Sequence, residues 1–107
     1  MINYSRSKIY CIRSRDTNEI IWIGGTVSNL KRRYWNHKCN SKDSLYQAVR
    51  ERGLDWHDLK IELVTDFESC KDRVTLNFAA EVAYIYTMQN NEPVLHHFLN
   101  NIDYFIE

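Results

Sequence analysis

The stretch from Lys8 to His37 constrains the fold of this chain most, because it alternates apolar runs with turn residues. An apolar run over Lys8–Arg13 and a second over Ile20–Gly25 flank the polar residues Asp16-Thr17-Asn18. Two short apolar runs around such a polar turn predict a β-hairpin, and Gly24-Gly25 is expected to end its second strand. A basic segment that ends in His37 follows the hairpin.

The length of the hairpin loop decides whether Tyr10 and Trp22 lie on one face of the sheet. A slip of one residue in register turns every side chain to the opposite face. A loop with an odd number of residues, such as Arg15–Glu19, pairs Ser14 with Ile20 and puts Tyr10 and Trp22 together. A loop with an even number of residues separates them, and the sequence leaves both arrangements open.

A helix is predicted over Ser28–Lys38, with Ser28 as its N-cap. Its residues Leu30, Arg33, Tyr34 and His37 recur at the spacing of a single helical stripe. We therefore expect Arg33 and His37 to face inward, while Lys31 and Arg32 turn towards solvent.

The rest of the chain predicts two more helices and one more strand. Asp43 or Ser44 opens a helix that ends near Gly53, Asp58–Phe67 alternates as a third strand, and Lys71–Gln89 forms the longest helix. The tail after Pro93 is predicted to pack as a short helix or a final strand. The expected fold class is α+β, with a three-stranded antiparallel sheet flanked by helices in a single domain over residues 1–107.

Glu81 is the most informative residue of the long helix. The apolar residues Val74, Phe78, Ile85 and Met88 are expected to form its buried stripe, and Glu81 falls in the middle of them. A buried carboxylate is costly unless it is paired or bound to a cation. Glu81 is therefore predicted to form a salt bridge with a core-facing arginine such as Arg33, or to be a metal ligand or catalytic acid facing a cleft. The two predictions do not exclude each other, because both place the same arginine beside Glu81.

Charge is distributed unevenly along the chain, although the formal net charge is zero. Residues 1–53 hold eleven Lys+Arg and four Asp+Glu, a charge of +7, whereas residues 54–107 hold three and ten, a charge of −7. This asymmetry allows one basic face to meet phosphates, or the two halves to attract each other. The absence of a long apolar run and the odd cysteine count predict a soluble, intracellular protein with free thiols and no membrane partner.

The order of these elements resembles the core of the GIY-YIG nuclease family. The first motif reads Lys8-Ile9-Tyr10 and the second reads Trp22-Ile23-Gly24. On the next helix Arg33 lies three residues after the apolar Leu30, as the family's catalytic arginine lies three residues after an apolar position. The run Glu81-Val82-Ala83-Tyr84-Ile85 is similar to the family's metal-binding segment. Lys8 replaces a glycine, one extra residue separates Gly24 from Arg33, and His96 follows Pro93-Val94-Leu95 where the family has an asparagine. The largest departure is Trp22 in place of the second tyrosine, since an indole cannot accept a proton.

This resemblance implies a metal-dependent DNA endonuclease that hydrolyses phosphodiester bonds in double-stranded or branched DNA. Tyr10 would relay the proton of the attacking water, Arg33 would hold the phosphate, His37 would supply the proton shuttle that Trp22 cannot, and Glu81 would bind one Mg²⁺ or another divalent metal. The residues expected to contact DNA are Lys8, Trp22, Lys31, Arg32, Arg33 and Lys38. The alternative is a catalytically degenerate module that kept the fold and binds nucleic acid or protein.

Overall fold

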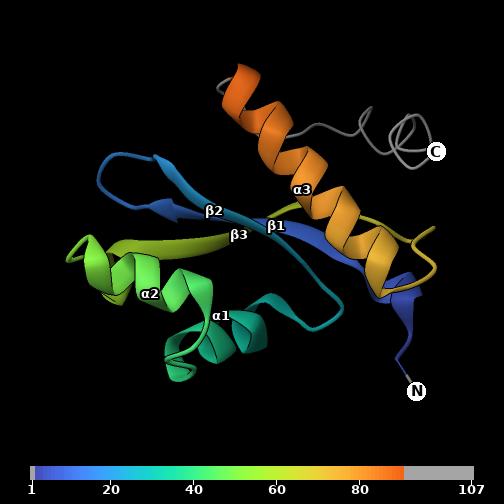
Figure 1. Ribbon diagram of the computed structural model, residues 1–107, viewed down its shortest axis with the longest axis horizontal. Coiled ribbons are helices and arrows are strands. Elements are labelled where there is room, and N and C mark those ends of the chain that lie inside the picture. The colour runs from blue at the N-terminus through green and yellow to red at the C-terminus, as the bar shows by residue number, and fades with distance from the viewer. Residues whose placement is uncertain (1, 91–107) are drawn as a thin grey trace.

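The computed structural model describes residues 2–90 and has the α+β architecture expected from the sequence (Figure 1). Its antiparallel sheet has the order β2-β1-β3, with β1 over Lys8–Ser14, β2 over Ile20–Thr26 and β3 over Leu59–Asp66. The helices are α1 (Leu30–Cys39), α2 (Ser44–Glu51) and α3 (Arg73–Asn90). Short 3-10 turns lie at Tyr4–Arg6 and Trp56–Asp58. The predicted tail after Pro93 lies outside the described residues.

The sheet separates two layers of helix, with α3 on one face and α1 and α2 on the other (Figure 1). On the α3 face, Ile9 and Cys11 of β1 are buried against a cluster that includes Leu76, Ala79 and Ala83. On the opposite face, Tyr10 and Ile12 are buried against a cluster that includes Leu45, Val49 and Leu59. Alternate residues of the central strand therefore supply two different cores, as the pleat of a strand requires.

The hairpin takes the register that places Tyr10 and Trp22 on one face. Tyr10 lies opposite Gly24 and Ile12 lies opposite Trp22, which is the arrangement expected from an odd loop, one of the two that the sequence leaves open. An irregularity after Ile12 then pairs Arg13, not Ser14, with Ile20. The strand β2 also continues past Gly25 to Thr26, further than the sequence predicted.

Side-chain caps determine where the first two helices begin. Asn29, and not Ser28 as predicted, is the N-cap of α1, because its side chain accepts a hydrogen bond from the Arg32 amide at 2.8 Å. Asp43, one of the two residues expected to open the second helix, is the N-cap of α2. Gly53 follows the end of α2 with a φ of +65°, a conformation that favours glycine.

The buried stripe of α3 differs from the predicted one. Leu76, Ala79 and Ala83 are buried, whereas Val74, Ile85 and Met88 are exposed. Glu81 is exposed as well, so the expectation of a carboxylate buried in an apolar stripe is wrong.

Two smaller expectations also bear on the described residues. The three cysteines are free thiols, with Cys11 and Cys70 buried and Cys39 exposed. Within residues 2–90, no helix combines the length and the apolar character that crossing a bilayer requires.

Candidate active site

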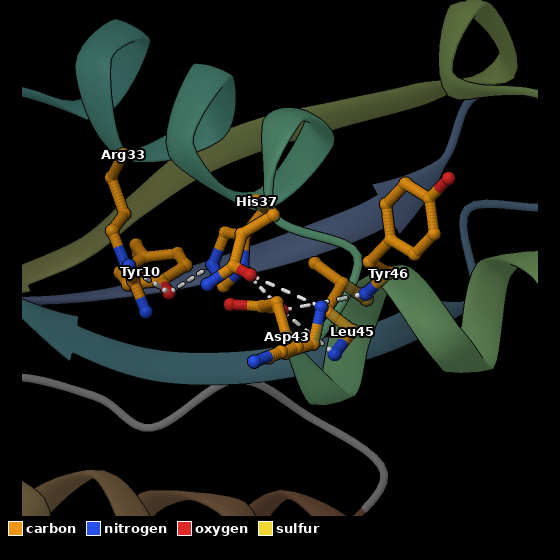
Figure 2. A network of polar contacts seen from close by, with 8 residues as sticks. Tyr10, Arg33, His37, Asp43, Leu45 and Tyr46 are labelled. Carbon is orange, nitrogen blue, oxygen red and sulfur yellow. Dashed lines mark hydrogen bonds and ion pairs between the residues drawn. The ribbon is translucent and has the colours of Figure 1, made fainter.

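Three of the four predicted catalytic residues meet in one hydrogen-bonded chain between β1 and α1 (Figure 2). The Tyr10 hydroxyl lies 2.7 Å from His37 Nε2, and Arg33 Nε donates to the same hydroxyl at 3.2 Å. Both α1 residues reach the sheet because they lie on the inward stripe of the helix, as the sequence predicted. Lys31 and Arg32 are exposed, also as predicted.

Asp43 extends this chain on the far side of His37. Its Oδ1 atom lies 2.9 Å from His37 Nδ1 and also accepts hydrogen bonds from the backbone amides of Leu45 at 2.9 Å and Tyr46 at 3.4 Å. The carboxylate therefore caps α2 and contacts the imidazole with the same oxygen. The sequence predicts only a helix start at Asp43 or Ser44, because the six-residue separation of Asp43 from His37 follows no recognised motif.

Proton positions along the chain follow from which atoms can accept. A carboxylate only accepts, so His37 Nδ1 carries the hydrogen that is donated to Asp43. In a neutral imidazole the other nitrogen, Nε2, is then an acceptor, and the Tyr10 hydroxyl donates to it. The hydrogen bonds therefore all point the same way: Arg33 donates to Tyr10, Tyr10 donates to His37, and His37 donates to Asp43.

Burial keeps the two central groups neutral at pH 7. Desolvation lowers the pKa of His37 below its ordinary value, although the hydrogen bond to Asp43 opposes this. Desolvation likewise raises the pKa of Tyr10 above its ordinary value, and the charge of Arg33 opposes that rise. Tyr10 and His37 are both 0% exposed, so the hydroxyl has no contact with solvent in this conformation.

Trp22 packs beside this chain from β2. Its ring meets the His37 ring edge-on, with centroids 5.9 Å apart and planes at 73°. Its N–H is close enough to the Tyr10 hydroxyl to oppose the rise in the Tyr10 pKa, but it has no hydrogen-bond partner within residues 2–90. Trp22 therefore occupies space next to Tyr10 without joining the hydrogen-bonded chain.

Glu81 lies apart from this chain, on the edge of a hollow of about 400 Å³ beside β2. Trp22 lines the same hollow, together with the apolar residues Ile21, Ile23, Ala48, Ala80 and Tyr84. In the described part of the chain, Glu81 forms no ion pair with Arg33, so the predicted salt bridge is absent. Tyr10, Arg33 and His37 are thus linked by hydrogen bonds, and Glu81 is not part of this network. Trp22 lies between the two, because it packs against His37 and also lines the hollow beside Glu81.

The described residues contain no group of three or more His, Cys, Asp or Glu side chains placed to hold a metal. Mg²⁺ is commonly held by one or two carboxylates together with water and the phosphate of a substrate. An exposed carboxylate such as Glu81 fits that kind of site, because its oxygens are open to water and to a phosphate.

The basic residues expected to contact DNA have different surroundings. The Lys8 ammonium donates to the backbone carbonyls of Arg6 at 3.0 Å and Ser28 at 3.2 Å, so it links the first 3-10 turn to the loop between β2 and α1. Lys38 lies over the Tyr34 ring, 5.8 Å from its centroid. Lys31 and Arg32 project from α1, and Trp35 beside them is 62% exposed. Trp35 was not predicted as a site residue, although an aromatic residue within a basic segment is a recognisable signal.

Comparisons with family models, with characterised proteins and with solved structures find no match to this chain. The resemblance to GIY-YIG nucleases therefore rests on the residues and the order of elements described above.

Proposed function

We propose that this protein is a metal-dependent DNA endonuclease that hydrolyses phosphodiester bonds through a GIY-YIG-type site. The observation that supports it best is the chain from Arg33 through Tyr10 and His37 to Asp43. A buried polar chain inside an apolar core costs desolvation energy, so a chain with every member hydrogen-bonded is a candidate for a working site. Its composition, a cation followed by proton donors and acceptors, suits attack on a phosphodiester.

Arg33 is the member of the chain that a phosphate would meet first. It is partly exposed, and it forms no ion pair with any residue in the range 2–90. Its Nε is engaged by Tyr10, which leaves the two terminal nitrogens for a phosphate oxygen. The exposed residues Lys31, Arg32 and Trp35 on the outward side of α1 would bind the DNA backbone and stack on a base.

Glu81 would hold the divalent metal, Mg²⁺ or a similar ion, at the edge of the hollow beside Trp22. When bound, such an ion polarises the phosphate and lowers the pKa of a coordinated water. Tyr10 and His37 would transfer the proton, because Trp22 has no titratable oxygen.

A second candidate function is a nucleic-acid-binding module without catalysis. The closed Tyr10 hydroxyl favours it, because a buried phenol beside Trp22 cannot reach a water in this conformation. In this case Arg33, Lys31 and Arg32 would still bind phosphate, while the polar chain would serve only to position α1 on the sheet.

The deciding experiment incubates the purified protein with supercoiled plasmid and with branched DNA, in Mg²⁺ or Mn²⁺ and in chelator. For a nuclease we expect cleavage only with metal, and a loss on the order of 10²–10⁴ in rate for Tyr10→Phe and for Glu81→Ala. Trp22→Tyr should keep or raise the rate. The controls Tyr34→Phe, which removes a hydroxyl bonded to the Trp56 carbonyl, and Glu68→Ala, an exposed carboxylate elsewhere, should cut like wild type.

DNA binding is measured in the same variants by fluorescence anisotropy at several salt concentrations. Glu81→Ala should bind like wild type, whereas the double variant Lys31→Gln/Arg32→Gln should bind more weakly and with a smaller salt dependence. Inert wild-type protein whose Trp22→Tyr variant cuts DNA would establish the binding module instead. Equal cleavage by wild type, Tyr10→Phe and Trp22→Tyr would rule out both accounts of the site.

A further inference from the structure

We propose that Asp43 is a positioning residue that fixes His37 as the Nδ1–H tautomer and so makes Nε2 the acceptor for the Tyr10 proton. The catalytic consequence rests on the proposed nuclease function, whereas the tautomer itself can be measured without any activity. Nothing in the sequence motifs assigns a role to Asp43 beyond the cap of α2.

The carboxylate is held rigidly enough to impose this tautomer. The Asp43 side chain is 14% exposed, and its Oδ1 accepts from the Leu45 and Tyr46 amides as well as from His37 Nδ1 (Figure 2). Because the first turn of α2 supplies two of these three donors, the oxygen cannot turn away from His37 without breaking the cap. The orientation of the imidazole is thereby tied to the start of a helix.

The other groups around His37 are consistent with a single direction of proton movement. Tyr10 lies at Nε2 and Trp22 packs against the ring edge-on, while Arg33 carries the nearby positive charge. None of these three can accept a hydrogen from Nδ1, because Tyr10 is at the opposite nitrogen and the other two side chains carry no acceptor. Among the described residues, Asp43 is the group whose position selects the tautomer.

Proton transfer along this chain balances without another reagent. The O–H bond of Tyr10 breaks as an N–H bond forms at His37 Nε2, which leaves a phenolate beside the Arg33 guanidinium and an imidazolium beside the Asp43 carboxylate. This step requires substrate binding to open the Tyr10 hydroxyl, which is buried in the conformation described here, to a water molecule. The phenolate then takes a proton from that water, and the oxygen electron pair released forms the new bond to phosphorus. As the bond from phosphorus to the leaving oxygen breaks, a water on that side of phosphorus protonates the leaving oxygen, because the attacking and leaving oxygens lie in line. His37 returns its proton to solvent, which neutralises the hydroxide left by that water.

Without Asp43, no described group would hold the hydrogen of His37 on Nδ1. His37 could then carry its hydrogen on Nε2, facing the Tyr10 hydroxyl as a donor rather than as an acceptor. In Ser-His-Asp proteases a change that leaves the wrong tautomer lowers kcat by about 10⁴-fold. We expect a loss of at least about 10²-fold here, because the same kind of proton transfer would be blocked.

The test compares Asp43→Ser, which keeps a good N-cap but is too short to reach His37, with Asp43→Asn. ¹⁵N NMR of the imidazole reports which ring nitrogen carries hydrogen. In wild type we expect a protonated Nδ1 and a bare Nε2, and in Asp43→Ser a shift of the hydrogen towards Nε2 with a small change in Tm. In Asp43→Asn the Leu45 and Tyr46 amides should hold the amide oxygen at the position that faces His37 Nδ1, because in wild type one oxygen accepts from all three groups. This variant should therefore keep the wild-type tautomer, unlike the protease change, and cut DNA at an intermediate rate.

The matched control is Asp55→Ser, because Asp55 also caps a turn, through the His57 amide at 2.9 Å, but does so at an exposed site. It should leave both the His37 spectrum and cleavage unchanged. An Asp43→Ser protein that keeps the Nδ1–H tautomer would overturn the proposal, and so would one that changes tautomer yet cuts DNA at the wild-type rate. If wild type is inert but its tautomer responds to Asp43→Ser, the positioning role stands and the nuclease function fails.

Discussion

Gly24 is the residue on which the position of Tyr10 most directly depends. A Cβ at this position would lie 2.6 Å from the Tyr10 hydroxyl oxygen and 3.0 Å from Trp22 Nε1. Because Tyr10 is fully buried and hydrogen-bonded, it cannot move aside cheaply. We expect Gly24→Ala to destabilise the protein by roughly 1–3 kcal/mol, as overpacking does, and to disturb the ¹⁵N spectrum of His37. Urea unfolding and NMR measure the two effects.

The neighbouring Gly25 provides the control on the other face of the same strand. A Cβ there would lie 2.7 Å from Leu76 Cδ1, in the core under α3. Gly25→Ala should therefore lower stability by a similar amount while leaving the His37 spectrum as in wild type. A Gly24→Ala protein with unchanged stability and an unchanged His37 spectrum would show that the close packing of Tyr10 over Gly24 is wrong.

The sequence allowed the inward placement of Arg33 and His37 to be predicted, because the apolar neighbours Leu30 and Tyr34 mark one face of a short helix. The partnership between His37 and Asp43 could not be predicted, since it depends on how the loop between α1 and α2 turns. The prediction that Glu81 is buried was wrong for a related reason. Its burial depends on which side of α3 meets the sheet, and that is a property of the whole element.

Helix α3 has apolar residues on every side, so helical periodicity alone does not select its buried face. The predicted stripe through Val74 and the observed stripe through Leu76 both recur at helical spacing. The small residues Ala79 and Ala83 lie on the observed stripe, where they let the helix approach the sheet closely. Side-chain volume, rather than hydrophobicity, explains why this face packs.

Substitution of the two stripes tests which one is buried. Leu76 is 0% exposed, so Leu76→Ala should lower the free energy of unfolding by roughly 2–5 kcal/mol through the cavity that it leaves. Val74 is 77% exposed, and Val74→Ala should change the free energy of unfolding by no more than about 0.5 kcal/mol. Both values come from urea unfolding followed by circular dichroism. A larger loss of stability in Val74→Ala than in Leu76→Ala would show that the stripe predicted from the sequence is the buried one.

At the scale of the whole molecule, the sheet separates an apolar layer under α3 from a layer under α1 and α2 that contains the buried polar chain. The edge of β2 is where the two layers meet, and there the hollow lined by Trp22 and Glu81 opens. A site that used both residues would therefore combine side chains from the two sides of the sheet. This arrangement also makes the stability of the fold depend on two neutral buried groups, Tyr10 and His37.

Because both groups are neutral in the folded protein, stability should be highest at intermediate pH and should fall in both acid and alkali. The pKa of His37 is lowered in the folded state from an ordinary value of 6.5, so its contribution to stability is complete above about pH 6.5. It declines as pH falls below that, because the unfolded chain binds the proton more readily. The pKa of Tyr10 is raised from 10.0, so stability should also fall as pH rises above about 10.

Thermal unfolding between pH 5 and pH 11 measures both limits, with Arg33 and Asp43 left intact beside the two groups. We expect Tm to fall below about pH 6.5 in wild type, and His37→Gln to flatten this decline, while His57→Gln, at an exposed site, leaves it unchanged. Tyr10→Phe should reduce the alkaline decline only in part, because burial also raises the pKa of Tyr34 and of Cys11. A wild-type acid decline that persists in full in His37→Gln would mean that the imidazole is not buried as a neutral group, and the direction of the Tyr10–His37–Asp43 chain would have to be reassigned.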